Sequence, residues 1–340
     1  MPSPPLLEVN DLYVRFPTPA GPVNAVAGVS FTVSAGETVA VVGESGSGKS
    51  VSSLALLGLL GSGNISAGSV LLRDEELVGA APERLRQLRG SELAMIFQNP
   101  MSSLDPLFTI GDQLIEALRA HRPMTRRAAR VRAVELLREV GLPDPDRRVR
   151  AYPHELSGGQ QQRVMVAIAL TGEPALLIAD EPTTALDVTV EAQILELLRT
   201  MQREHGTALL LITHDMAVVA EMADRVVVMY AGRVVEQGPV AEVLRSPRNP
   251  YTRALIDSIP TPSTPRDQPM PAIAGSVPTP AEAPSGCRFH PRCPSALDRC
   301  SEAEPPLYEL QPGRASRCWL HEDALRASPA PATGEVRHVA

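Results

Sequence analysis

The segment Gly43–Ser50 constrains the fold of this chain more than any other part of its sequence. It reads Gly-Glu-Ser-Gly-Ser-Gly-Lys-Ser, which matches the pattern G-x-x-x-x-G-K-[ST]. Such a loop turns backbone N–H groups toward phosphate oxygens, and the helix that follows adds the positive end of its dipole. Because this arrangement requires a buried strand before the loop and a helix after it, we predict an α/β fold with a phosphate-binding P-loop.

Lys49 stands out from the composition of the chain. Of 32 basic residues it is the only lysine, and all the others are arginines. We predict that its compact ammonium reaches the β- and γ-phosphates of a nucleotide, and that the Ser50 hydroxyl ligates Mg²⁺. An ordinary glycine-rich turn is the alternative, which the register of Lys49 and Ser50 disfavours. The other loop residues predicted to bind the nucleotide are Gly43, Ser45, Gly46, Ser47, Gly48 and Val51.

Alternating strands and helices are predicted for residues 6 to 245, which form the first domain. Short apolar runs indicate buried strands of a parallel sheet. These runs are Thr38–Val42, Ala175–Ala179, Ala208–Thr213 and Arg225–Tyr230. Thr125 and Asp187 are predicted to cap helices that end at Gly141 and Gly206. Residues 88–165 are helix-rich and read as an inserted helical subdomain, whereas the alternation within residues 6–35 predicts an antiparallel edge sheet.

Two carboxylates follow the apolar run at Ala175. Asp180 and Glu181 would lie at the carboxyl end of a central parallel strand, where such sheets bind ligands. We predict that Asp180 completes the magnesium shell and that Glu181 polarises the attacking water. His214 follows the next strand and therefore belongs at the same edge.

The charge of the chain limits the classes of partner. The net charge is −7, which disfavours sequence-independent binding to nucleic acid. Residues 119–150 hold ten arginines against four acids, and we interpret them as a solvated helix face. The longest apolar stretches are far shorter than the roughly 20 residues of a membrane span, and no secretory signal is visible. We therefore expect a cytoplasmic protein unless a partner holds it at a membrane.

The C-terminal part differs in composition. Residues 246–286 contain ten of the 33 prolines and are predicted to be extended and loop-like. We predict an irregular Pro- and Cys-rich C-terminal extension over residues 246–325, followed by a disordered tail at residues 326–340.

All four cysteines lie in this extension, at Cys287, Cys293, Cys300 and Cys318. Their spacing is not the paired C-x₂-C of common zinc sites, and disulfides would suit a secreted chain. Four thiolates suit a [4Fe–4S] cluster. Zinc, free thiols and disulfides remain open, and His290 and His321 could also be ligands, although they are expected on the surface.

A further motif points to a known family. Leu156–Gln160, Leu-Ser-Gly-Gly-Gln, resembles the signature of ATP-binding cassette (ABC) proteins, and it lies between the P-loop and the Asp180–Glu181 strand. Gln98 resembles the Q-loop glutamine, Ala185–Asp187 the D-loop and His214 the switch histidine. Phe16 resembles the aromatic residue that stacks on adenine, with Tyr13 as its rival. The resemblance covers about residues 6–240 and implies the P-loop NTPase fold of an ABC cassette.

The resemblance also implies partners. In such proteins the signature of one cassette, here Ser157, Gly158, Gly159 and Gln160, caps the ATP held by another. The resemblance also implies that Asp187 of the D-loop binds the nucleotide. Gln98 would join the Mg²⁺ shell. A chain with one cassette and no span therefore implies a second cassette, most simply a homologue in a heterodimer, and two separate permease subunits. It would lie at the cytoplasmic face of the cell membrane, held there by those subunits.

Three segments resemble the oligopeptide/dipeptide permease ATPases: Asn99–Pro106, Asn249–Leu255 and Gly286–Cys318. This resemblance implies an ATP-hydrolysing subunit of a bacterial importer of di- or oligopeptides, served by an extracytoplasmic substrate-binding protein. Some members of this subfamily carry a [4Fe–4S] cluster. Nickel-permease ATPases share these features and remain an alternative, as does a small-solute importer of the same subfamily. A non-transport cassette ATPase acting on ribosomes or DNA is the alternative from another class.

Overall fold

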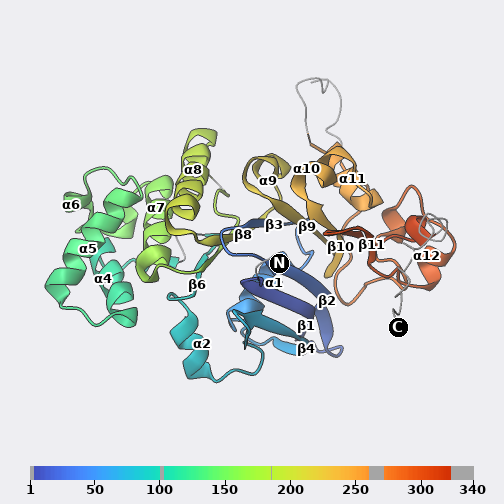
Figure 1. The fold of residues 1–340 in the computed structure, drawn as a ribbon, viewed down its shortest axis with the longest axis horizontal. Helices are drawn as coiled ribbons and strands as arrows, with labels where there is room; N and C mark the ends of the chain where they lie inside the picture. Colours follow the sequence, from blue (N-terminus) through green and yellow to red (C-terminus); the bar gives the residue numbers. More distant parts are fainter. Residues whose placement is uncertain (1–3, 100–102, 185, 260–271, 323–340) are drawn as a thin grey trace, which may run out of the picture.

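The computed structural model describes residues 4–99, 103–184, 186–259 and 272–322 of the chain. They form two sheets with helices around them (Figure 1). The larger sheet has the strand order β11-β12-β10-β9-β3-β8-β7-β6, and the smaller one has the order β2-β1-β4-β5.

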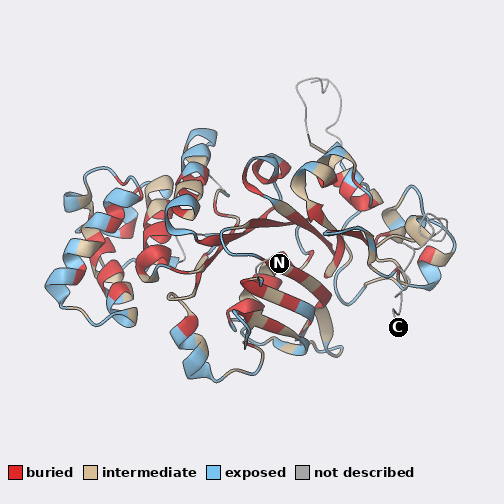
Figure 2. Ribbon diagram, viewed as in Figure 1, coloured by how far each residue is buried: buried red, intermediate tan, exposed pale blue. Residues whose placement is uncertain are grey.

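The centre of the larger sheet is parallel. Its strands here are β3 (Thr38–Val42), β6 (Leu93–Ile96), β7 (Leu176–Asp180), β8 (Ala208–Thr213) and β9 (Arg225–Tyr230). Every residue of β3, β7 and β8 is buried, as Figure 2 shows for the middle of the molecule. Helices and the second sheet cover the two faces, which is why these strands are continuous apolar runs. The four predicted strands are confirmed, with β7 shifted by one residue.

The smaller sheet is antiparallel and forms a separate layer. It consists of β1 (Leu7–Phe16), β2 (Val23–Val33), β4 (Asn64–Leu72) and β5 (Glu75–Glu76). Helix α1 (Lys49–Leu56) contacts both this sheet and β7, so it lies between the two layers (Figure 1). Antiparallel pairing of the N-terminal strands is confirmed. These strands form a sheet of their own, because β1 pairs with β2 and β4 and β4 pairs with β5.

The helical segment contains α4 (Ile110–His121), α5 (Arg126–Glu139), α6 (Pro145–Arg148) and α7 (Gly158–Ala169). Thr125 caps α5 as predicted, and its apolar stripe is buried against α4 and α7. The predicted limits of 88–165 include one strand, because β6 pairs with β7 in the main sheet. The short helix α2 (Pro82–Leu88) precedes β6.

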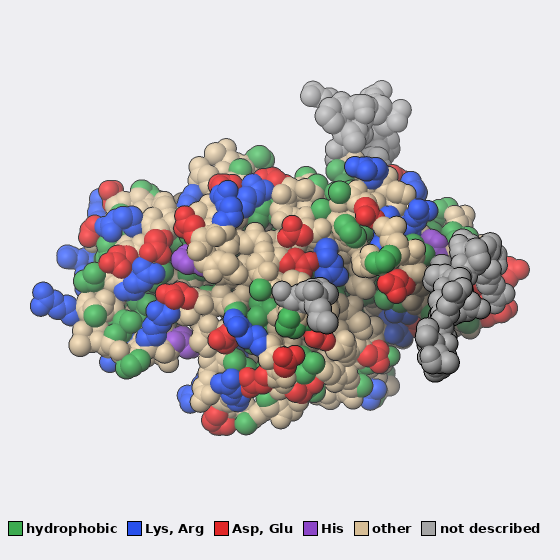
Figure 3. Space-filling model, in the orientation of Figure 1, with side chains coloured by type: hydrophobic (Ala, Val, Ile, Leu, Met, Phe, Trp, Pro, Cys, Tyr) green, Lys and Arg blue, Asp and Glu red, His purple; other side chains and the backbone are tan. Residues whose placement is uncertain are grey.

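The basic stretch at 119–150 is partly neutralised by ion pairs. Arg126 lies 2.7 Å from Asp112, and Arg132 lies 2.6 Å from Glu139. Figure 3 shows basic and acidic side chains interspersed over the left end of the molecule, where α4, α5 and α6 lie in Figure 1. The pairs agree with the interpretation of a solvated helix face. None of the described helices is long and apolar enough to cross a membrane.

The remaining helices of the first domain flank the sheet. They are α8 (Val188–His205), α9 (Met216–Met222) and α10 (Val240–Arg245). Asp187 caps α8 and Gly206 ends it, as predicted. Strand β10 (Arg233–Pro239) then pairs with β9 in the antiparallel sense.

The C-terminal extension is more ordered than the proline content indicates. Its described elements are α11 (Pro250–Asp257), α12 (Arg299–Glu302), β11 (Tyr308–Gln311) and β12 (Arg314–Ser316). The prediction of extended chain is wrong for α11, because Asn249 caps it and Pro250 occupies its first turn. The strands continue the main sheet, since β12 pairs with β10. Predictions for residues 260–271 and 326–340 lie outside the described residues.

Candidate active site

The loop between β3 and α1 has the backbone that the glycines predict. Gly43 and Gly48 adopt φ angles of 151° and 97°, which residues with a Cβ rarely adopt. A Cβ at Gly43 would also lie 2.1 Å from the carbonyl oxygen of Met229. The loop therefore packs directly against the end of β9, and glycine is required at this position.

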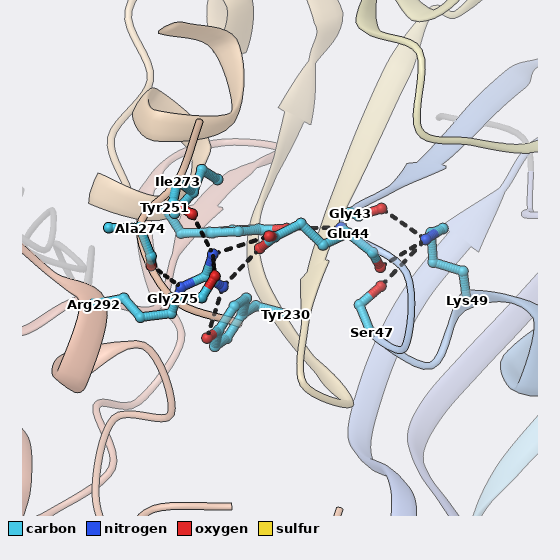
Figure 4. Close-up of polar contacts among 10 residues, drawn as sticks. All are labelled: Gly43, Glu44, Ser47, Lys49, Tyr230, Tyr251, Ile273, Ala274, Gly275 and Arg292. Atoms are coloured by element: carbon cyan, nitrogen blue, oxygen red, sulfur yellow. Dashed lines mark hydrogen bonds and ion pairs between the residues drawn. The ribbon is translucent and has the colours of Figure 1, made fainter. Parts of the chain in front are cut away.

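The Lys49 side chain lies inside this loop and is 6% exposed. Its Nζ donates to the carbonyl oxygen of Gly43 at 2.7 Å and to that of Glu44 at 3.0 Å (Figure 4). Burial lowers the pKa of Lys49, against the opposing attraction of Glu181 and Asp180. The ammonium is thus held by carbonyl groups at the place where a phosphate would bind.

Ser50 and Asp180 are brought together from the helix and the strand. The Ser50 hydroxyl donates to Oδ1 of Asp180 at 3.1 Å. Asp180 ends β7, and burial raises its pKa, while the hydrogen bond from Ser50 opposes that effect. A hydroxyl and a carboxylate side by side are the hard oxygen donors that Mg²⁺ prefers. The pair therefore fits the predicted magnesium ligands.

Glu181 accepts hydrogen bonds from three side chains. Gln98 and Thr184 donate to Oε2, each at 2.8 Å, and Nδ1 of His214 lies 3.2 Å from Oε1. Burial by itself would raise the pKa of Glu181, but the hydrogen bonds from Thr184 and His214 outweigh the effect of burial. The pKa of Glu181 is therefore lowered. The carboxylate is therefore ionised at neutral pH. The backbone of Glu181 adopts a positive φ of 47°.

The structure thus brings together six of the predicted residues: Lys49, Ser50, Gln98, Asp180, Glu181 and His214. Thr184 was not predicted, although it lies three residues after Glu181 and carries a hydroxyl. Two residues from beyond position 245, Tyr251 and Arg292, also contact the P-loop at Glu44. No sequence pattern marks Arg292 among the many arginines.

The signature residues lie apart from this edge. Ser157 caps α7, and its hydroxyl and backbone N–H form a capping box with Gln160. Within the described residues, none of their side-chain hydrogen bonds reaches the P-loop. Gly159 instead packs closely against α8, because a Cβ added at Gly159 would lie 2.5 Å from the Val190 side chain. Asp187 accepts hydrogen bonds from the first turn of α8.

The two aromatic candidates for adenine stacking lie on β1. The guanidinium carbon of Arg233 is 5.9 Å from the centre of the Tyr13 ring, so one face of that ring is covered. Phe16 packs over Gly63, where a Cβ would lie 2.6 Å from the Phe16 ring. Both rings are only partly exposed.

The four cysteines are free thiols, so the disulfide alternative is wrong for this structure. Burial raises the pKa of Cys287 to about 11, and the nearby thiols Cys300, Cys318 and Cys293 add to the effect. The thiols therefore share one neighbourhood. Among the described residues, however, no three His, Cys, Asp or Glu side chains gather closely enough to hold a metal ion. The side chains of the described residues therefore do not form the predicted cluster site.

His290 and His321 each lie against backbone oxygens. Nδ1 of His290 is 3.0 Å from the carbonyl oxygen of Cys287, and Nε2 of His321 is 3.0 Å from that of Arg248. These contacts agree with structural roles for both rings.

Comparisons with known proteins agree with this geometry. Residues 26–184 match the model of the ABC transporter family, and residues 235–300 match the oligopeptide/dipeptide transporter C-terminal region. A putative peptide import ATP-binding protein of Brucella abortus is 51% identical over 92% of this chain and 94% of its own length. The oligopeptide transport ATP-binding protein AppD of Bacillus subtilis is 51% identical over 94% of this chain and 97% of its own.

Solved structures show the same fold. The dimeric ATP-binding cassette MJ0796, in a post-hydrolysis state with ADP and Pi, has a TM-score of 0.61 and 28% identity, over 69% of this chain and 98% of that one. The cassette cbiO1 of Clostridium perfringens has a TM-score of 0.61 and 29% identity, over 71% of this chain and 91% of that one. The architecture is that of an ABC ATPase cassette. The chain belongs to the ABC transporter family, in the group with the oligopeptide/dipeptide C-terminal region, and is an ATPase coupled to transport.

Proposed function

We propose that the chain binds ATP at the carboxyl edge of its parallel sheet and drives a peptide importer by hydrolysing it. The observation that carries the proposal is the meeting of the P-loop lysine with two carboxylates at that edge. The loop residues Gly43, Ser45, Gly46, Ser47, Gly48 and Val51 would hold the phosphates through backbone N–H groups. Lys49 would exchange its carbonyl partners for the β- and γ-phosphates.

Ser50, Asp180 and Gln98 would hold the Mg²⁺ ion that accompanies the nucleotide. Bound there, the ion neutralises charge that develops on the phosphate oxygens. Gln98 follows β6, and its amide already reaches the Glu181 carboxylate. We infer that Gln98 joins the magnesium ligands to the residues that position water.

Glu181 would act on the attacking water. Its pKa is lowered by hydrogen bonds from Thr184 and His214, which outweigh the effect of burial, so it can accept a hydrogen bond from water. His214, whose side chain is 62% exposed, would hold the carboxylate and contact the γ-phosphate. Phe16 would stack on the adenine, because one face of the rival ring, Tyr13, is covered by Arg233.

A second cassette would complete the site. The exposed capping serine Ser157, with Gly158, Gly159 and Gln160, presents a helix N-terminus that fits a phosphate held by another subunit. Asp187 caps α8 beside it. We infer a homologous partner cassette in a heterodimer, docked under two permease subunits at the cytoplasmic face of the membrane. An extracytoplasmic binding protein would deliver the substrate.

An assembly in which only this chain carries Ser157→Arg tests the trans arrangement. Nucleotide trapping at the partner's P-loop should be lost, whereas trapping at Lys49 of this chain should persist. Loss of the site built on Lys49 itself would contradict the arrangement.

The peptide substrate rests on the names of the relatives and on the match over residues 235–300. Co-purification with hydrophobic permease subunits would separate a transporter from the alternative of a cassette ATPase that acts on ribosomes or DNA. Hydrolysis by the reconstituted transporter should then be stimulated by short peptides in the presence of the binding protein. Stimulation by Ni²⁺ and not by peptides would favour the nickel alternative.

The [4Fe–4S] cluster at Cys287, Cys293, Cys300 and Cys318 is retained as a proposal. Its support is the shared neighbourhood of the four thiols. Protein purified without oxygen should then be brown and hold about four irons per chain. Colourless anaerobic protein or stoichiometric zinc would reject the cluster.

A further inference from the structure

Glu44, the second residue of the P-loop, is held at three points. Its carbonyl oxygen accepts from Nζ of Lys49 at 3.0 Å, and its backbone N–H donates to the Tyr251 hydroxyl at 2.9 Å. Its carboxylate accepts two hydrogen bonds from Arg292, at 2.9 and 3.0 Å (Figure 4). Two of the three points therefore come from residues outside the ATPase motifs.

Both partners belong to the C-terminal part of the chain. Tyr251 lies in the first turn of α11, 207 residues after Glu44. Arg292 lies 248 residues after Glu44, in a 3₁₀ turn within the loop between Cys287 and Cys293. The loop that carries two of the four cysteines thus bonds directly to the P-loop.

Arg292 is itself fixed in place. Its side chain is 6% exposed, and its Nε donates to the carbonyl oxygen of Ala274 at 2.7 Å. Its guanidinium carbon lies 5.7 Å from the centre of the Tyr230 ring and 5.9 Å from that of Phe289. The two-pronged bond to Glu44 raises the pKa of Arg292 further above its already high value. A planar guanidinium held on all sides can orient a carboxylate more firmly than a flexible ammonium can.

Tyr251 is equally constrained. It is fully buried, and its ring lies 4.6 Å from that of Tyr230 and 5.3 Å from that of Phe289. These three rings form a cluster that joins β9, α11 and the Cys287–Cys293 loop. The hydroxyl that receives the Glu44 N–H therefore cannot move without disturbing this cluster.

A second contact from the same loop reaches the P-loop indirectly. Arg288 donates to the carbonyl oxygen of Ala231, in the turn after β9. The next residue, Gly232, donates its N–H to the carbonyl oxygen of Ser47 at 2.8 Å. The Cys287–Cys293 loop thus supports the P-loop at Glu44 and, through Ala231 and Gly232, at Ser47.

We propose that Arg292 and Tyr251 are positioning residues of the P-loop, through which the C-terminal extension sets the affinity for ATP. They fix the Glu44 backbone so that the neighbouring N–H groups and Lys49 are already arranged for the phosphates. Preorganisation of this kind increases affinity because the loop loses less freedom on binding. The proposal rests on the proposed function, namely that Gly43–Ser50 is the nucleotide site.

The test measures Mg²⁺-dependent binding of a fluorescent ATP analogue to the purified full chain. Arg292→Gln should raise the dissociation constant roughly tenfold, as expected on loss of a charged hydrogen-bond partner. Arg292→Lys should recover only part of this loss, since an ammonium lacks the planar fork that makes two parallel hydrogen bonds to a carboxylate. Arg299→Gln is the matched control, because this arginine of the same extension bonds to Glu322 and to the carbonyl oxygen of Trp319.

A double-mutant cycle separates positioning from general support of the fold. Glu44→Gln and Arg292→Gln should each weaken ATP binding. The double variant should bind ATP no more weakly than the single variant with the lower affinity. The proposal would be overturned if the losses of ATP binding in the two single variants were additive in the double variant, or if Arg299→Gln bound ATP as weakly as Arg292→Gln does. Wild-type affinity in Arg292→Gln would overturn it as well.

Tyr251→Phe keeps the test decisive if Arg292→Gln does not fold. It removes only the hydroxyl and retains the aromatic cluster, and it should weaken ATP binding several-fold, in line with the loss of one neutral hydrogen bond. Unchanged affinity in Tyr251→Phe would count against the proposal. Lys49→Ala distinguishes failure of the proposed nucleotide site from failure of the positioning role. If Lys49→Ala binds ATP normally, the proposed nucleotide site is wrong. If Lys49→Ala loses ATP binding while the Arg292 and Tyr251 variants keep it, only the positioning role is wrong.

Discussion

The active-site edge and the C-terminal extension both depend on charged side chains, but they use them in opposite ways. At the edge, His214 is 62% exposed and Lys49 bonds to loop carbonyls that a ligand can replace. In the extension and the strand beside it, the side chains of Arg292 and Arg314 are 6% exposed and that of Glu236 is fully buried, each bonded to other parts of the chain.

The difference follows from the supply of apolar side chains. The parallel strands bury long apolar runs, so the cassette does not need its edge residues for stability. The described part of the extension contributes few apolar side chains to the core, the largest that are buried being Tyr251 and Phe289. Its loops are held instead by hydrogen bonds from guanidinium and amide groups, each of which stabilises by about 1 kcal/mol. Edge variants should therefore change activity, whereas variants of extension residues that do not contact the P-loop should change stability.

The largest expected effect is that of Glu181→Gln. Hydrolysis should fall by roughly 10²–10⁴, the range for a positioned general base, while ATP still binds. The urea midpoint of unfolding should not fall, because the Glu181 side chain forms its hydrogen bonds with other edge residues, which the cassette does not need for stability. Steady-state ATPase rates and urea titrations check both statements. Near-normal turnover would remove Glu181 from the role of base.

Lys49→Arg should be the next largest effect. The ammonium lies buried within the loop against the carbonyl oxygens of Gly43 and Glu44, and a planar guanidinium does not fit the same space. ATP affinity should fall about ten- to hundredfold, the loss expected for a hydrogen bond to a charged group. Equilibrium binding of a fluorescent ATP analogue measures it. Tight binding by the arginine variant would show that the lone lysine has no special role.

The same comparison explains what the sequence could predict. Strands β3, β8 and β9 were predicted to the residue, because each is a continuous apolar run. The edge residues follow from the rule that carboxyl ends of parallel strands meet. Local signals of this kind need no knowledge of distant parts of the chain.

The extension was predicted less well because its contacts are long-range. Strand β11 alternates between half-buried and exposed residues and is ordered by pairing with β12. The bond from Arg292 to Glu44 spans 248 residues. Helix α11 could have been found, since Asn249 before Pro250 is a capping signal, but the proline content of the segment obscured it.

Glu236→Gln should mainly reduce stability. Its two carboxylate oxygens accept the N–H groups of Arg248 and Asn249 at 2.8 and 2.9 Å, and Arg314 lies 3.5 Å away. A glutamine can accept only one of these bonds and would set its NH₂ group against the other donor. The free energy of unfolding should fall by about 1–3 kcal/mol. Urea unfolding measures this loss, and a fall in the turnover of molecules that remain folded would weaken the comparison.

Glu242→Gln should have the smallest effect and is the matched control for Glu236→Gln. Both carboxylates face Arg314, but the Glu242 side chain is 42% exposed and lies 3.4 Å from the guanidinium. Water screens this pair, and an exposed ion pair contributes about 0–1 kcal/mol. The glutamine oxygen can also still accept a hydrogen bond from Gln311. The urea midpoint should therefore stay close to that of the unchanged protein. A loss as large as that of Glu236→Gln would mean that charge near Arg314, and not burial of its partner, determines how firmly the extension is held.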